Sequence, residues 1–200
     1  MKDINATVIV NITPPEDEIL KNLDKDARWG INRAKKDNLI VEETNKKEDW
    51  NEFYNIYKQT IFEGGADIES IEELKKKIIV FFVCKKERKI IAGAALEMKK
   101  EKPTLYINAS LKEFKNSQPN NLLYWECIIW SKKHGFKELD LGGWQINASE
   151  HLWGINKFKE RWGKVYYYYE DYSFPKAIGR KLIRNFRFFW WLNKKLKGRK

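Results

Sequence analysis

The sequence predicts an α+β fold in which helices flank one mixed, mostly antiparallel central sheet. Apolar, β-branched runs alternate with amphipathic segments along the chain, and three of these runs follow one another between residues 78 and 111. Hydrophobic residues occupy 42% of the 200 positions and aromatic residues 14%. This composition supplies enough apolar surface for a packed core and excludes an intrinsically disordered chain.

The elements can be placed in order from these patterns. Strands are expected at 7–12, 39–43, 78–85, 89–98, 104–111, 137–141 and 165–169, and helices at 15–36, 47–62, 68–77, 119–135, 149–162 and from 175 onward. Pro15 followed by three acidic residues is typical of a helix start, and the glycines at 64 and 65 end the next long helix. This order of elements is that of the N-acetyltransferase-like (GNAT) architecture.

The sequence predicts one domain followed by a basic, aromatic C-terminal segment. No internal repeat or low-complexity linker divides it, so residues 1–174 are expected to form a single GNAT-like domain. Residues 175–200 are expected to form a basic, aromatic C-terminal helix. Its apolar and basic faces fit peripheral contact with a membrane, contact with RNA, or a helix docked on the sheet with a solvated basic side.

Charge and cysteine usage narrow the class of protein further. The 39 basic and 28 acidic residues give a net charge of +11, which favours an anionic partner such as RNA, a phosphorylated substrate or a membrane surface. Cys84 and Cys127 lie in apolar runs and are expected to be buried, reduced thiols. Two histidines without a cysteine cluster predict no metal site. The longest apolar run, 78–84, is far shorter than the ~20 residues of a membrane span. With no signal-peptide pattern at the N-terminus, the chain is expected to be cytoplasmic, with possible peripheral contact at the inner membrane face.

Several segments together resemble the Fem-type aminoacyltransferases. They are RWGINRAKKDNLIVEE (28–43), YINAS (106–110), PNNLLYWE (119–126), LDLGG (139–143) and FKERWG (158–163), in the order and spacing of that family. The resemblance implies a GNAT-like fold and transfer of an amino acid from aminoacyl-tRNA to an amino group of a peptidoglycan or other cell-envelope precursor. Family members usually have two GNAT-like domains, and this chain resembles the C-terminal one alone.

The donor is expected to be a co-substrate rather than a bound cofactor, either aminoacyl-tRNA or acyl-CoA. Enzymes of the GNAT class that use coenzyme A bind its pyrophosphate at a glycine-rich turn before a helix, through backbone N–H groups. The corresponding segment here, 116–123, has no glycine, and Pro119 removes one N–H donor. This favours aminoacyl-tRNA. The alternatives are an acyl-CoA-dependent N-acetyltransferase of an envelope sugar or polysaccharide, and a non-catalytic relative that binds RNA or membrane.

Two residues are predicted to be catalytic. Asp140 ends a strand before Gly142 and Gly143, where a carboxylate could orient or deprotonate the acceptor amine, or could merely cap a loop. Lys159 lies in the segment that resembles the family's F-K-x-x-F-G motif. A predicted buried stripe of Leu152, Ile155 and Trp162 would place its ammonium on the core side of a helix. An unpaired ammonium there needs an anion, and the resemblance suggests the 3′ end of the donor RNA or the oxyanion formed at its ester.

Other residues are predicted to bind substrate. Tyr106, Asn108 and Ser110 share one face of their strand, where they could line a cleft or form a solvated face. The resemblance adds three more residues, Arg28 and Lys36 from its first segment and Phe158 from its last.

Overall fold

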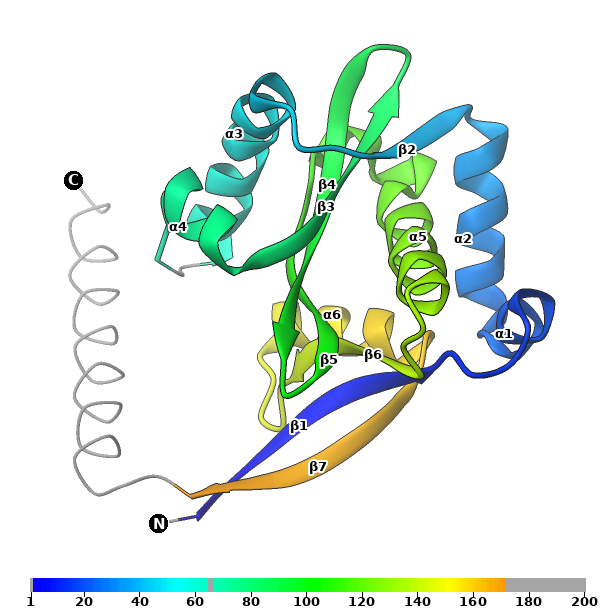
Figure 1. The fold of residues 1–200 in the computed structure, drawn as a ribbon, viewed down its shortest axis with the longest axis vertical. Helices are drawn as coiled ribbons and strands as arrows, with labels where there is room; N and C mark the ends of the chain where they lie inside the picture. The colour runs from blue at the N-terminus through cyan, green and yellow to red at the C-terminus, as the bar shows by residue number, and fades with distance from the viewer. Residues whose placement is uncertain (1, 65–66, 172–200) are drawn as a thin grey trace. The chain divides into compact units, whose positions relative to one another are not determined.

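The computed structural model describes residues 2–64 and 67–171 (Figure 1). The chain divides into two compact units, one formed by residues 7–166 and the other by residues 1–6 together with those from 167 onward. The cavities and site residues described below all belong to the first unit. The predicted domain boundary at 174 and the predicted helix from 175 lie outside the described residues.

Seven strands form one sheet, which confirms the predicted mixed and mostly antiparallel class. The strands are β1 (Lys2–Asn11), β2 (Leu39–Glu43), β3 (Ile78–Lys86), β4 (Lys89–Lys99), β5 (Lys102–Ser110), β6 (Glu138–Trp144) and β7 (Lys164–Asp171). Their order across the sheet is β2-β3-β4-β5-β6-β1-β7. The β2–β3, β3–β4 and β4–β5 pairs are antiparallel, whereas β5 and β6 are parallel.

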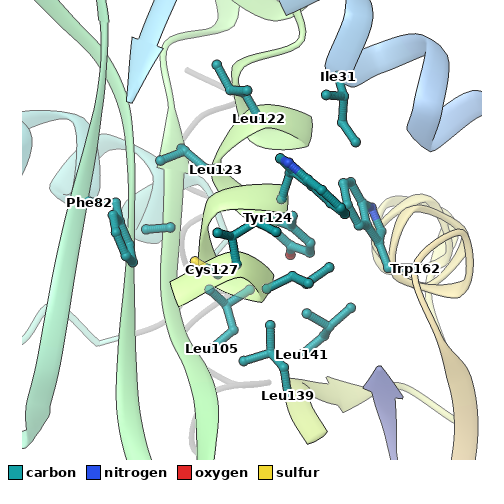
Figure 2. Close-up of a cluster of buried hydrophobic side chains, with 14 of the residues drawn as sticks. Ile31, Phe82, Leu105, Leu122, Leu123, Tyr124, Cys127, Leu139, Leu141 and Trp162 are labelled. Atoms are coloured by element: carbon teal, nitrogen blue, oxygen red, sulfur yellow. The ribbon is translucent and has the colours of Figure 1, made fainter. Parts of the chain in front are cut away.

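Helices cover both faces of the β2–β4 part of the sheet. The helices of the described residues are α1 (Glu16–Asn22), α2 (Lys25–Lys36), α3 (Lys47–Gly64), α4 (Ile71–Lys77), the 3₁₀ turn η1 (Lys112–Ser117), α5 (Pro119–Lys133) and α6 (Glu150–Glu160). Figure 1 shows α2 and α5 on one face and α3 and α4 on the other. A separate apolar core lies on each face, because a sheet with two covered faces must bury side chains of both orientations. The larger core, which joins α2, α5 and the segment after α6 to the sheet, is shown in Figure 2.

The structure divides the helix predicted for residues 15–36 into two. Leu23 is extended, and Asp24 begins a new helix by accepting a hydrogen bond from the backbone N–H of Asp26. An aspartate at this position satisfies a donor that the first turn of a helix leaves unpaired. The apolar spacing continues across the break, which is why periodicity alone did not reveal it.

The predictions about thiols and membrane spans can be compared with the described part of the chain. Cys84 and Cys127 are free and buried, as predicted, and burial raises the pKa of both thiols. No helix among the described residues is both long enough and apolar enough to cross a membrane.

Candidate active site

A cavity of about 670 Å³ opens where the parallel strands β5 and β6 meet the start of α5 and the inner side of α6. Strands β5 and β6 are in register at Thr104 and Asp140, and the cavity lies beyond this pairing, toward the carboxyl ends of both strands. Its lining consists of Leu105, Tyr106, Asn108, Ser110, Lys115, Gln118, Pro119, Asn120, Asn121, Tyr124, Leu141, Gly154, Ile155, Phe158, Lys159 and Arg161. Crevices at the carboxyl ends of parallel strands are common ligand sites in sheets of this kind.

The polar stripe predicted on β5 forms one wall of this cavity. Tyr106, Asn108 and Ser110 all line it, so the stripe lies along a cleft and is not a fully solvated face. Asn108 donates to the Gly93 carbonyl at 3.3 Å and to Oδ1 of Asn120 at 3.2 Å, and Asn120 in turn donates to Oγ of Ser110 at 3.1 Å. These bonds fix the two amides and leave the Ser110 hydroxyl as a donor that can point toward a ligand.

Lys159 lies on the opposite wall and is the most strongly perturbed cation of the site. Its Nζ donates to the Gly143 carbonyl at 3.0 Å, at the end of β6. Burial lowers the pKa of Lys159 to about 8, and the nearby charge of Asp140 partly opposes that shift. Gly142 adopts a φ of +75°, and a Cβ there would lie 3.1 Å from the Leu105 carbonyl and 3.7 Å from Lys159 Nζ. A glycine therefore allows the strand end to approach the ammonium.

The buried stripe predicted on α6 is wrong for two of its three members. Leu152 and Ile155 are 36% and 41% exposed, and only Trp162 is buried, at 3%. Asn156 is buried in their place because its amide bonds both the N–H and the carbonyl of Gln145, satisfying the loop after β6. Lys159 still faces inward, because it follows Asn156 by three residues and precedes Trp162 by three.

Asp140 is close to the site but does not line the cavity. Its Oδ1 accepts the hydroxyl proton of Thr7 on β1 and, at 2.8 Å, the backbone N–H of Gly142. The carboxylate thus holds the strand end and also acts electrostatically on Lys159. Of the two sequence interpretations of Asp140, the loop cap describes its contacts; its action on an acceptor amine stays a prediction.

Arg28 and Lys36 lie apart from the cavity. The Arg28 guanidinium donates to the carbonyl of Lys21 at 2.8 Å and to that of Leu23, where it satisfies the end of α1. Lys36 is exposed in the last turn of α2. Neither residue lines the cavity, whereas Phe158 does, with its ring centroid 5.0 Å from that of Tyr124 in an edge-to-face arrangement.

Sequence reasoning missed two other cations on the cavity. Lys115 from η1 and Arg161 from the end of α6 join Lys159, and none of the residues that line this cavity is a carboxylate. Arg161 also pairs with Asp26 of α2 at 3.2 Å. The lining favours an anionic ligand, because it has three basic side chains and no acidic one, and only Arg161 pairs with a carboxylate from outside it. Arg161 belongs to the 158–163 motif, so the motif itself was the available signal.

A polar cluster beside Tyr106 was also missed. The Tyr106 hydroxyl donates to Oε1 of Glu69, and Lys77 Nζ donates to the Tyr106 oxygen at 2.8 Å while also pairing with Oε2 of Glu69. Ser70 and Glu73 form a capping box that fixes the start of α4 next to Glu69. That capping pattern is visible in the sequence, but the contact of Glu69 with a residue 37 positions away is not.

The start of α5 borders the cavity with an unusual turn. Gln118 adopts the left-handed conformation, with φ +60°, and Pro119 is the first helical residue. Asn121 is 2% exposed and packs directly against Gly30 of α2, where a Cβ would collide with its amide. The turn before α5, which has no glycine, is therefore formed by Gln118 in the left-handed conformation followed by Pro119.

Comparison with known proteins agrees with this fold. The family model described as "Acetyltransferase (GNAT) domain" matches residues 71–160, which contain β3 to β6 and α6. The matched segment carries most of the cavity lining, from Leu105 to Lys159. The fold is that of the GNAT class, and the match over residues 71–160 supports an acyltransferase. A search of curated protein sequences found no match.

Solved structures add a more particular likeness. The chain superposes on the crystal structure of FemX with a TM-score of 0.68 and 17% identity, covering 81% of this chain and 59% of that one. The C-terminal domain of a putative lysylphosphatidylglycerol synthetase from Agrobacterium fabrum gives 0.64 and 15% identity, covering 84% and 60%. The L-PGS structure from Bacillus licheniformis gives 0.58 and 15%, covering 88% and 64%. The chain thus has the fold of these proteins and spans about 60% of their length.

Proposed function

We propose that the chain transfers an aminoacyl group from aminoacyl-tRNA to an amino group of a peptidoglycan or other cell-envelope precursor. The observation that carries this proposal is the cavity itself, which is lined by three cations and no carboxylate. One of these cations, Lys159 of α6, is partly desolvated and contacts the end of β6. The likeness in fold to FemX and to a protein named lysylphosphatidylglycerol synthetase supports an aminoacyl donor. Because this chain spans only part of those proteins, their activities enter here as a proposal.

In this reaction the neutral acceptor amine attacks the ester carbonyl, and negative charge develops on the carbonyl oxygen. Lys159 would stabilise that charge, and two observations support this role: its ammonium bonds a neutral group, the Gly143 carbonyl, and it is partly dehydrated. Asp140 supports the protonated form of Lys159 from behind. The other two cations, Lys115 and Arg161, would hold phosphate groups of the donor.

An acyl-CoA donor is the second candidate, because residues 71–160 match an acetyltransferase family. The start of α5 weighs against it. Its Gln118–Pro119 turn offers one backbone N–H fewer than the glycine-rich turns that bind pyrophosphate.

The two donors can be separated in one experiment. The purified protein is incubated in parallel with labelled aminoacyl-tRNA and labelled acetyl-CoA, each with a lysine-containing stem pentapeptide and with glucosamine as acceptors. Discharge of the RNA ester onto the peptide is the expected result. Thiol release from acetyl-CoA alone would replace the proposal by the second candidate. Tight tRNA binding without transfer from either donor would indicate a non-catalytic relative.

Binding of the RNA should depend steeply on salt, because each neutralised phosphate releases counterions. We expect the logarithm of the association constant to fall linearly with the logarithm of salt concentration, by roughly 0.7–0.9 per phosphate contacted. A tRNA affinity that does not change between low and moderate salt would contradict an electrostatic RNA site.

We place the reaction in the cytoplasm, at the inner face of the membrane, with residues 175–200 as the proposed lipid contact. This segment lies outside the described residues, and the proposal rests on its basic and aromatic sequence. Removal of residues 176–200 is expected to weaken association with anionic vesicles while the melting temperature changes little. Loss of folding on truncation would instead make the segment part of the core.

A further inference from the structure

The cavity has two phenols in its lining, and only one of them is surrounded by charged groups. Tyr124 is almost fully buried, and burial raises the pKa of its hydroxyl. Tyr106 is partly buried on the opposite side, and its hydroxyl contacts both a carboxylate and an ammonium. The proposed function uses neither hydroxyl, and it gives no role to Glu69 or Lys77.

The cluster around Tyr106 is held in one geometry by several independent contacts. Tyr54 from α3 donates to the Glu69 carbonyl at 3.0 Å, and the Glu69 N–H donates to the Tyr57 hydroxyl at 3.3 Å. Lys77, at the end of α4, lies with its Nζ 5.2 Å from the centre of the Tyr106 ring. The segment before α4 is therefore anchored so that Glu69 and Lys77 meet on one phenol.

We propose that Tyr106 is a further catalytic residue, a general acid that protonates the leaving oxygen of the donor, and that Lys77 and Glu69 position it. This inference rests on the proposed function, since it concerns the same acyl transfer. Tyr106 lines the cavity that Lys159 lines from the other side, so an acyl group bound between them would present its leaving atom toward the phenol.

The proton and electron balance of the step is simple. When the tetrahedral intermediate collapses, the bond from carbonyl carbon to leaving oxygen breaks, and its electron pair stays on that oxygen. The oxygen takes the proton of Tyr106, so an O–H bond breaks on the phenol and another forms on the released ribose. The tyrosinate that remains faces the Lys77 ammonium at hydrogen-bond distance. The nitrogen loses its extra proton to water, and the tyrosinate recovers one from water by way of Lys77, which is 45% exposed.

The ionisation of the cluster agrees with this role. Burial and the bond to Glu69 raise the pKa of Tyr106, while Lys77 acts in the opposite direction, so the phenol keeps its proton at neutral pH. Its bonds to Glu69 and Tyr106 raise the pKa of Lys77, which therefore stays an ammonium and makes a poor nucleophile. The pKa of Glu69 is lowered by its bonds to Lys77 and Tyr106, although burial opposes them, so the carboxylate stays an acceptor. Each group is thus in the protonation state that an acid with a cationic support needs.

The test compares two donors that differ in one atom. One is an aminoacylated RNA minihelix with the natural 3′ oxygen, and the other ends in 3′-thioadenosine and carries the same aminoacyl group as a thioester. A thiolate leaves with far less need of protonation than an alkoxide. We expect Tyr106→Phe to lose ~10²–10⁴-fold in kcat with the oxygen ester, the usual contribution of a general acid, and far less with the thioester.

Matched variants separate catalysis from structure. Tyr166→Phe removes the hydroxyl of an exposed tyrosine on β7 that neither lines this cavity nor contacts the Tyr106 cluster, and it is expected to transfer at the wild-type rate. Lys77→Met should slow transfer from the oxygen ester, and Lys77→Arg should restore most of it because the positive charge returns. If Tyr106→Phe loses equally with both donors, or loses nothing, the acid role is wrong. A wild-type protein that transfers from neither donor would instead refute the proposed function.

Discussion

Lys159 lines the cavity, Lys77 contacts the lining residue Tyr106 from α4, and the structure treats the two lysines in opposite ways. Lys159, on the β6–α6 wall, is partly dehydrated and bonds a neutral carbonyl, so its pKa is lowered to about 8. Lys77, at the end of α4, is half-exposed and pairs with Glu69, so its pKa is raised. The first ammonium lacks a directly bonded anion and is ready to meet one during the reaction, whereas the second already has its counterion. A charge kept for a transition state must be left incompletely satisfied in the resting protein.

The largest effect is expected from Lys159→Met, which keeps the bulk of the side chain and removes its charge. We expect kcat to fall by ~10²–10³, the usual effect of removing one preorganised oxyanion partner. Stability should move the other way, because a pKa lowered from 10.5 to about 8 corresponds to up to about 3 kcal/mol of strain in the charged form.

Measured transfer rates and urea unfolding of the same protein check both halves of this prediction. Lys99→Met, at the exposed end of β4, serves as the control for loss of a positive charge away from the cavity. Wild-type turnover in Lys159→Met would remove Lys159 from the mechanism, and a clear loss of stability would show that its ammonium is well satisfied in the folded protein.

A change of pH should deprotonate Lys159 while Lys77 keeps its proton, without any mutation. If the ammonium of Lys159 is the active form, kcat falls as the pH rises through about 8, approaching tenfold per unit above it. Stability of the wild-type protein should rise between about pH 8 and 10.5, because there the unfolded chain binds a proton that the folded protein has released. Lys159→Arg, which stays charged, should lack the limb near pH 8 in a profile of initial rates. A rise in rate through pH 8 that is lost in Lys159→Arg would make Lys159 a base.

Asp140→Asn should alter the ionisation of Lys159 and have a smaller effect on turnover than Lys159→Met. Asparagine keeps an Oδ1 that can accept from Thr7 and Gly142, so the strand end should hold its shape. The charge that supports the Lys159 ammonium is lost, so the limb near pH 8 moves to lower pH and turnover at neutral pH decreases. Donor binding should change little, because Asp140 does not line the cavity. A pH profile identical to that of the wild type would reduce Asp140 to a loop cap.

The smallest expected effect is the contribution of the Lys77–Glu69 ion pair to the stability of the protein. Lys77→Met removes an ion pair whose side chains are 45% and 30% exposed, and pairs of that kind contribute little to folding. The melting temperature should therefore stay close to that of the wild type, even though transfer from the oxygen ester slows. A large fall in melting temperature would make the Glu69–Lys77 pair a structural feature first.

The sequence was most informative where function and local pattern coincide. Lys159 and the stripe from Tyr106 to Ser110 were found from a motif and from the alternation of a strand, and both line the cavity. Glu69 could not be found in this way, since its partner Tyr106 lies on another element, and only the folded chain brings the two together. Leu152 and Ile155 were misjudged because apolar spacing cannot reveal that the buried Asn156 satisfies a loop. The motif could not show that the Arg28 guanidinium would satisfy the end of the neighbouring helix and leave Arg28 outside the cavity lining.

The position of β1 in the sheet bears on how much chain an active protein of this type needs. The family match begins at residue 71, yet the strand beside β6 is built from the first residues of the sequence, and its Thr7 bonds Asp140. A fragment cut to 71–160 would leave one side of β6 without its partner, and an open strand edge of this kind pairs readily with other molecules. Such a fragment is expected to aggregate, and the carboxylate behind Lys159 would lose an anchor. The segment needed for a stable fold is therefore longer than residues 71–160, because it must also contain β1, the strand that pairs with β6.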